Sequence, residues 1–290
     1  MGVDFLIREA KYAGSWYEGT EAGLKKTLES FFKTDKRGPK IIPEIREDGP
    51  RQIVAIVSPH AGYMYSAAIA AYGYAELAFD GRPDLFIICG VDHHGYGMRA
   101  AASTQSEGSW RSPLGTAKIN SEVANKILSI TPKKIQDAPS AHQAEHSLEI
   151  QLPFLQYIYG PEIEFVPIMI SSSTLADFQA IGNAIAEACK EMNVVLVAST
   201  DFTHFESATC AKNKDQKAID AILNLDEELL YKTVRQNNIS MCGYGSTSTV
   251  IRAAVALGAK EAVLLRYGNS SEVTGDSSDV VAYASLKLLK

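Results

Sequence analysis

The stretch Gln52–Tyr63, with the sequence QIVAIVSPHAGY, decides the fold that the sequence predicts. Residues 52–57 are mostly apolar and rich in β-branched side chains, which is typical of a strand buried on both faces. Pro59 ends this strand, because proline has no N–H to give to a neighbouring strand. We therefore expect His60 just beyond the carboxyl end of a strand, where open α/β sheets bind their ligands.

Three other apolar runs also end in polar residues. They are residues 84–90 before Asp92-His93-His94, residues 194–200 before Asp201 to His204, and residues 163–170 before Ser171-Ser172-Ser173. Five of the six histidines lie at such strand ends or in one predicted helix: His60, His93, His94, His146 and His204. This clustering predicts a shared polar pocket at one edge of the sheet.

The composition narrows the class of protein. Of the 290 residues, 46% are hydrophobic and 21% are charged, as in an ordinary globular protein with a sizeable core. The net charge of −6 argues against nucleic acid or an anionic membrane as a partner. The four cysteines form no CxxC motif, so neither a disulfide framework nor a zinc knuckle is expected. The charged N-terminal segment MGVDFLIREAKY does not resemble a signal peptide, and the chain has no 18-residue apolar run, which together predict a cytoplasmic protein.

Strand and helix patterns alternate along the chain as they do in βαβ units. We predict one α/β domain over residues 1–290, with a mostly parallel or mixed central sheet and helices on both faces. Residues 95–120 indicate a hairpin beside this sheet. Helices are expected at about 20–32, 66–79, 121–128, 143–159 with a break at Pro153, 175–192, 211–237 as two helices, and 245–257. Two further strands are expected at 262–267 and 280–285.

Cys242 precedes the helix predicted at 245–257, in the sequence CGYG. The positive end of a helix dipole lowers the pKa of a thiol there toward the thiolate, which is the form that ligates metals. An inert buried thiol is the plain alternative. A glycine-rich anion site is another, although a Walker lysine and a GxGxxG motif are both missing.

Asp201 and His204 lie three residues apart in one loop, a natural pair for acid–base chemistry or for orienting a ligand. Adjacent residues on an extended segment point opposite ways, so only one of His93 and His94 should face the pocket.

The predicted helix 143–159 carries the charged run Glu145-His146-Ser147-Leu148-Glu149. Its spacing is not HExxH, so we do not predict a zinc protease. We expect Glu149 on a solvated helix face, and His142 at the surface.

Seven motifs occur in order along the chain: AGSWY at 13–17, SPHAGY at 58–63, DHH at 92–94, EHSLEIQLPFL at 145–155, STDFTHF at 199–205, CGYG at 242–245 and DSSDVVAYAS at 276–285. As a set they resemble the Memo family of archaea, bacteria and eukaryotes, over essentially the whole chain. This family is similar in fold to the class III extradiol dioxygenases, whose non-haem iron is held by two histidines and a carboxylate.

The resemblance implies a metal site and a set of catalytic groups, and no organic cofactor. The implied metal ligands are His60, His94 and Cys242, and the implied catalytic residues are His204, Asp201 and His146. Cys242 stands where the dioxygenases have a carboxylate. Because a thiolate is a softer ligand, we expect Fe(II) first, with copper and zinc also accepted.

Two positions depart from the family pattern. Asp92 stands where a serine commonly precedes the two histidines, which alters a hydrogen bond. Tyr244 stands where the animal proteins have arginine, so an anion bound by that arginine is not expected here.

These features predict a metal-dependent, dioxygenase-related redox enzyme that acts on a small molecule. Two alternatives remain open: a binding protein that accepts a peptide in the cleft, as the link of the eukaryotic branch to receptor signalling suggests, and a protein that carries iron or copper without turnover. Prokaryotic family members are associated with a radical-SAM protein, which implies a partner in a shared modification pathway. Folds do not fix functions, so the reaction is only an expectation.

Overall fold

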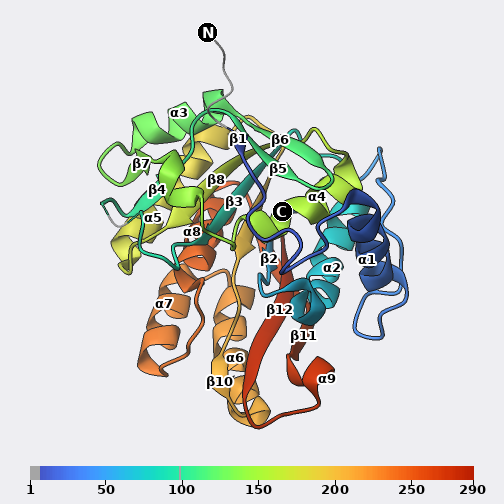
Figure 1. Ribbon diagram of the computed structural model, residues 1–290. Helices are drawn as coiled ribbons and strands as arrows, with labels where there is room; N and C mark the ends of the chain where they lie inside the picture. Colours follow the sequence, from blue (N-terminus) through green and yellow to red (C-terminus); the bar gives the residue numbers. More distant parts are fainter. Residues whose placement is uncertain (1–6, 98) are drawn as a thin grey trace.

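The structure is a computed structural model that describes residues 7–97 and 99–290, so the first six residues of the charged N-terminal segment lie outside it. A twelve-stranded mixed sheet runs through the molecule (Figure 1). Its strands are β1 (Ile7–Arg8), β2 (Ile53–Ser58), β3 (Leu85–Val91), β4 (Ala102–Thr104), β5 (Ser109–Ser112), β6 (Gly115–Ile119), β7 (Ile135–Asp137), β8 (Glu164–Ile170), β9 (Val194–Ser199), β10 (His204–Glu206), β11 (Glu261–Asn269) and β12 (Val280–Leu289).

The centre of the sheet is parallel, in the order β8-β3-β9-β2. Every residue of β2 and of β9 is buried, as expected for strands covered by helices on both faces. Beyond β2, β12 pairs antiparallel with β2, β10 and β11. On the far side, β5 and β6 form the hairpin predicted for residues 95–120, while β4 pairs with β7 and β8. The predicted α/β class with a mixed central sheet is confirmed.

Helices cover both faces of this sheet (Figure 1). They are α1 (Glu21–Lys33), α2 (Tyr63–Asp80), α3 (Ser121–Ile130), α4 (Leu152–Tyr159), α5 (Leu175–Cys189), α6 (Ala208–Leu223), α7 (Glu227–Gln236), α8 (Tyr244–Ala256) and α9 (Ser271–Thr274). Helices α1, α2 and α4 pack together on one face, and α5 and α8 pack together on the other. Thr20 caps α1 as predicted, since its side chain accepts a hydrogen bond from the Gly23 N–H. Within the described part of the chain, none of these helices has both the length and the apolar character that a membrane span needs.

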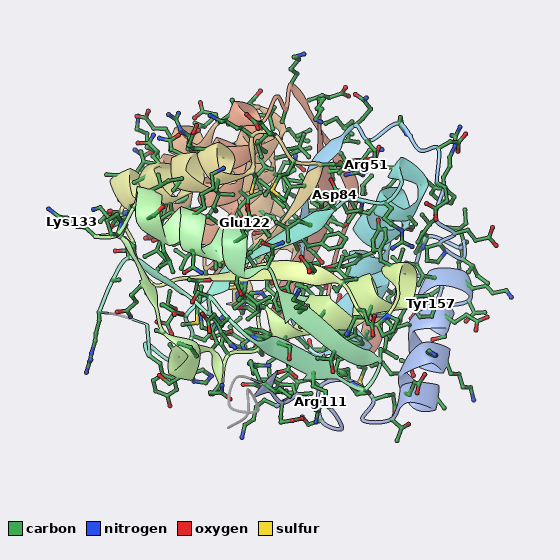
Figure 2. The ribbon with its side chains drawn as sticks, turned by 90° about the horizontal axis from the view of Figure 1, so that it is seen from above. Arg51, Asp84, Arg111, Glu122, Lys133 and Tyr157 are labelled. Atoms are coloured by element: carbon green, nitrogen blue, oxygen red, sulfur yellow. The ribbon has the colours of Figure 1, made fainter. Side chains whose placement is uncertain are left out.

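Charged side chains mark the outside of the molecule. Seen from above, Arg111 and Lys133 lie at its edges, and both are exposed (Figure 2). The buried interior is instead one large hydrophobic cluster formed by residues of the sheet and of the helices on both faces.

The helix predicted at 143–159 is wrong over its first half. The chain forms short 3-10 turns at Pro139–His142 and Glu149–Gln151, and an α-helix only at Leu152–Tyr159. Pro153 lies in the first turn of that helix, where its missing N–H costs nothing, so it begins a helix instead of breaking one. The irregular segment before it turns polar side chains inward, toward the sheet edge.

His142 is completely buried, so its predicted surface position is also wrong. Its backbone carbonyl accepts a hydrogen bond of 2.7 Å from Arg8 Nε, and its ring Nε2 lies 3.3 Å from Ser103 Oγ. Burial, followed by the nearby Arg8 charge, lowers the pKa of His142 from 6.5 to about 3. The folded protein therefore holds this imidazole neutral in mildly acidic solution.

This burial predicts an acid-sensitive fold. Below pH 6.5 His142 becomes protonated in the unfolded chain but stays neutral in the folded chain. The free energy of unfolding therefore falls as the pH drops, until about pH 3, where the folded chain is protonated as well. We expect wild-type protein to lose about 2 kcal/mol more stability than His142→Gln between pH 7 and pH 5, at about 1.4 kcal/mol per pH unit. Urea unfolding of both proteins at the two pH values measures this difference. Equal losses in the two proteins would contradict the prediction.

Candidate metal centre

Three neighbouring parallel strands bring the polar groups to one edge of the sheet. His60, His93 and Asp201 each lie two residues beyond the end of a strand, after β2, β3 and β9 respectively. Because these strands are parallel and adjacent through β9, their carboxyl ends meet, as the sequence predicted.

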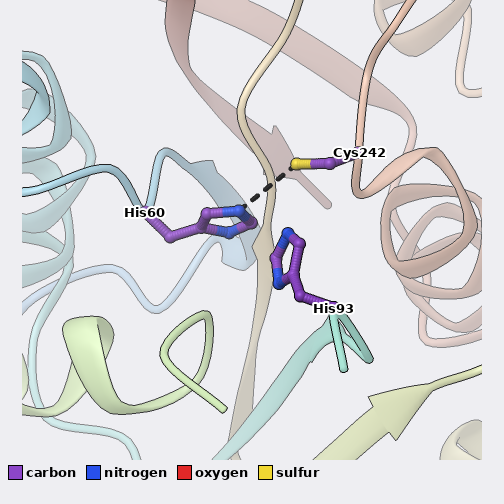
Figure 3. Close-up of side chains that lie close together, drawn as sticks. All are labelled: His60, His93 and Cys242. Carbon is purple, nitrogen blue, oxygen red and sulfur yellow. Dashed lines mark hydrogen bonds between the residues drawn. The ribbon is translucent and has the colours of Figure 1, made fainter. Parts of the chain in front are cut away.

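His60, His93 and Cys242 form a candidate metal-binding cluster, with their ligand atoms all within 4.8 Å of one another (Figure 3). The Cys242 sulfur lies 3.2 Å from His60 Nε2. Ligand atoms on a tetrahedral metal, at about 2.0 Å for nitrogen and 2.3 Å for sulfur, are themselves about 3.5 Å apart. Two imidazoles and one thiolate are also a donor set that Fe(II), copper and zinc accept. The three residues therefore fit a metal, after a small inward movement of His93.

The histidine beside His60 and Cys242 is His93, whereas the family pattern led us to expect His94. His94 lies on the outside of the loop, stacked against Tyr96 with ring centroids 5.4 Å apart. Asp92 shapes this loop by accepting hydrogen bonds from the Tyr96 and Gly97 N–H groups at 3.0 and 2.8 Å. Only one of the two adjacent histidines faces the pocket, in agreement with the alternation of an extended segment.

Glu145 holds His93 in place. One carboxylate oxygen accepts the His93 backbone N–H at 2.9 Å, and the other lies 2.9 Å from the ring Nδ1. Burial acts to raise the pKa of Glu145, but the hydrogen bond and the charge of His93, with smaller contributions from His146 and Ser147, lower it to about 2. Glu145 belongs to a segment that we predicted to be a helix, so nothing in the sequence pattern joined it to His93.

His60 and Cys242 are fixed by the loop after β9. The carboxylate of Asp201 accepts the His60 backbone N–H at 2.8 Å, and the Asp201 N–H points at the Cys242 sulfur at 3.4 Å. Burial lowers the pKa of His60 to about 3, so its ring is neutral. Burial raises the pKa of the Cys242 thiol well above its usual range, which is the opposite of the predicted effect of the helix N-terminus. The metal-free site thus holds a protonated thiol beside a neutral imidazole.

The two histidines that were predicted to be catalytic, His146 and His204, also reach this cleft. His146 packs between His93 and Trp16, at centroid distances of 4.4 and 4.5 Å, and burial lowers its pKa to about 3. His204 places its Nδ1 2.9 Å from the Ser240 carbonyl, which can only accept, so that nitrogen carries a hydrogen. The Asp201 carboxylate accepts a hydrogen bond from the His60 backbone N–H, and among the described contacts it makes no hydrogen bond with His204.

A cavity of about 680 Å³ opens over these residues. His60, His93, His146, Asp201 and His204 all line it. Its outer part is apolar, with Met64 63% exposed and Phe205 75% exposed. A volume of this size accommodates a small organic ligand, with an apolar rim around a polar floor.

Comparison with known proteins agrees with the motif pattern. A family model described as Memo-like protein matches residues 8–287. The chain is 41% identical to a MEMO1 family protein of Methanopyrus kandleri, over 97% of this chain and 98% of that protein. It is 39% identical to a MEMO1 family protein of Methanothermobacter thermautotrophicus, over 97% of this chain and 100% of that one.

The fold also resembles the crystal structure of an uncharacterized protein from Escherichia coli K12. The TM-score is 0.56 at 14% sequence identity, over 81% of this chain and 99% of that chain, which shows a shared fold alone. The family model and the archaeal relatives carry the stronger conclusion, because they span nearly the full length of the chain. The chain belongs to the Memo family.

Proposed function

We propose that this protein is a metal-dependent oxidoreductase that acts on a small organic molecule in the cleft. The single observation that carries the proposal is the convergence of His60, His93 and Cys242, two of which, His60 and His93, line a cavity of about 680 Å³. These three residues would hold Fe(II), or copper, and zinc is the third candidate. A bound redox-active metal would supply electron transfer to or from the substrate or O₂.

The remaining residues of the cleft have roles that their contacts support. His204 lines the cavity with its Nδ1–H held by the Ser240 carbonyl, so Nε2 of the neutral ring is the nitrogen that can take a proton from a bound substrate. Asp201 positions His60 and Cys242 through its carboxylate and its N–H. His146, held between Trp16 and His93, shapes the cavity wall beside the metal ligands.

A second candidate function is peptide binding in the same cleft. Met64 and Phe205 expose large apolar side chains at its mouth, as a surface that accepts an extended partner does. Metal carriage without turnover is a further proposal for the same site, and a radical-SAM partner in a shared modification pathway is a further proposal for the protein. A cytoplasmic location is in keeping with four free cysteines, two of them half-buried, because such thiols persist in reducing compartments.

Metal content tests the proposal directly. We expect protein purified anaerobically without a His-tag to carry close to one iron or copper per chain by mass spectrometry. His60→Ala and Cys242→Ser should each lose it, because each removes one of three ligands. Protein that neither carries a metal nor takes up Fe(II), Cu(I) or Zn(II) in titration would refute the metalloenzyme proposal. Peptide binding that His60→Ala abolishes in metal-free protein would favour the second function.

A further inference from the structure

Ser199, the last residue of β9, lies beneath the His60 ring and is completely buried. Its Oγ makes three contacts: 2.6 Å to the Ser147 carbonyl, 2.8 Å to Gln151 Nε2 and 2.9 Å to His60 Nδ1. A hydroxyl donates one hydrogen and accepts two, so these three contacts use its full capacity. Their directions can therefore be assigned.

The Ser147 carbonyl can only accept, so the Ser199 hydrogen points at it. The orientation of the Gln151 amide is fixed in the same way, because its nitrogen lies 3.0 Å from the Pro59 carbonyl, which also only accepts. Tyr74 donates to the other end of this amide at 2.6 Å. Gln151 thus donates to Ser199, and the remaining partner, His60 Nδ1, has to donate as well.

We infer that Ser199 is a positioning residue that holds His60 in the Nδ1–H tautomer. The unprotonated Nε2 then points at the Cys242 sulfur, 3.2 Å away, ready to bind a metal. The hydrogen bond on one imidazole nitrogen commonly sets which nitrogen ligates, and the groups that make it are part of the site. The consequence for metal binding rests on the proposed function, whereas the tautomer itself does not.

Glu145 acts on His93 in the same sense. Its Oε2 accepts the His93 backbone N–H at 2.9 Å, and its Oε1 accepts the Ser147 N–H at 2.8 Å. The His93 Nδ1 lies 2.9 Å from the same Oε1. An oxygen used in this way accepts, so Nδ1 of His93 carries a hydrogen, and Nε2 is the nitrogen through which the neutral ring would bind a metal. Residues 145–151, EHSLEIQ, therefore contribute Glu145, Ser147 and Gln151 and form the element that orients both histidines.

Imidazole nitrogen NMR on chelator-treated, metal-free protein tests the inference. We expect ¹⁵N shifts and ring couplings that give Nδ1–H and unprotonated Nε2 for His60 at neutral pH, and Nδ1–H for His93. His60 should lose its single tautomer in Ser199→Ala. A wild-type protein with His60 as the Nε2–H tautomer would overturn the inference, even if the variant failed to fold.

Zn(II) affinity provides the second readout. We expect Ser199→Ala to bind Zn(II) 10- to 100-fold more weakly than wild type, the range known for groups that orient a metal ligand. Ser248→Ala is the matched control, because Ser248 is buried and its hydroxyl has no hydrogen-bond partner within the described parts of the chain. Equal affinities in the two variants would refute the role of Ser199. Wild-type protein that shows the expected tautomers but binds no metal would refute only the proposed function.

Discussion

Replacing His93 with alanine should abolish metal binding, whereas replacing its neighbour His94 should leave it intact. His93 faces His60 and Cys242, and the Glu145 carboxylate forms hydrogen bonds with both its backbone N–H and its ring Nδ1. Removing one of three ligands should weaken binding by more than about 100-fold, since removal of an orienting group alone costs 10- to 100-fold. His94 instead stacks on Tyr96 outside the cluster, so its removal takes no ligand away.

The two variants differ by one position in the chain, which makes each the control of the other. Metal per chain by mass spectrometry and Zn(II) titration of stripped protein are the measurements. Thermal unfolding of both proteins establishes that each is folded. Loss of metal in His94→Ala with retention in His93→Ala would restore the assignment that the family pattern implied and would contradict the structure.

Much of the site could be predicted from strand ends alone. Short β-branched runs that stop at polar residues place His60, His93 and Asp201 at one edge of a parallel sheet, whatever lies between them. Cys242, 41 residues beyond Asp201, could be assigned to the same place only through the resemblance to a family. The structure supports that assignment with a contact of 3.2 Å to His60.

The sequence did not determine which of two adjacent histidines faces inward. An alternating pattern makes the two side chains point in opposite directions but does not say which of them points inward. Here Glu145, more than 50 residues away, holds His93 on the inward side. Residues 143–151 carried charges at helical spacing, so a solvated helix was the reasonable prediction. Tertiary hydrogen bonds to those charged side chains outweigh that local preference. Glu149, expected on a solvated face, is 1% exposed.

Glu149→Gln should therefore destabilise the protein strongly. The Glu149 carboxylate lies 2.7 Å from an Arg8 guanidinium nitrogen, with both side chains buried. The same carboxylate accepts the Tyr12 N–H at 2.8 Å and the Tyr17 hydroxyl at 2.7 Å. Glutamine keeps the volume but leaves the Arg8 charge uncompensated and turns an N–H₂ toward these donors. Breaking one side of a buried ion pair costs about 3–5 kcal/mol, and we expect a loss of that size in urea unfolding.

The loss should also reach the cleft, because Glu149 anchors the N-terminal segment that forms one of its walls. Trp16 lines the cavity and packs on His146, and its carbonyl accepts the Tyr63 N–H at 2.9 Å. We expect hydrogen exchange of residues 11–17 to increase in Glu149→Gln. The matched control is Glu9→Gln, whose ion pair with Arg111 is exposed, and such pairs contribute little. Arg111 lies at the edge of the molecule (Figure 2). If both variants were as stable as wild type and exchanged equally, the buried pair would not hold this wall in place.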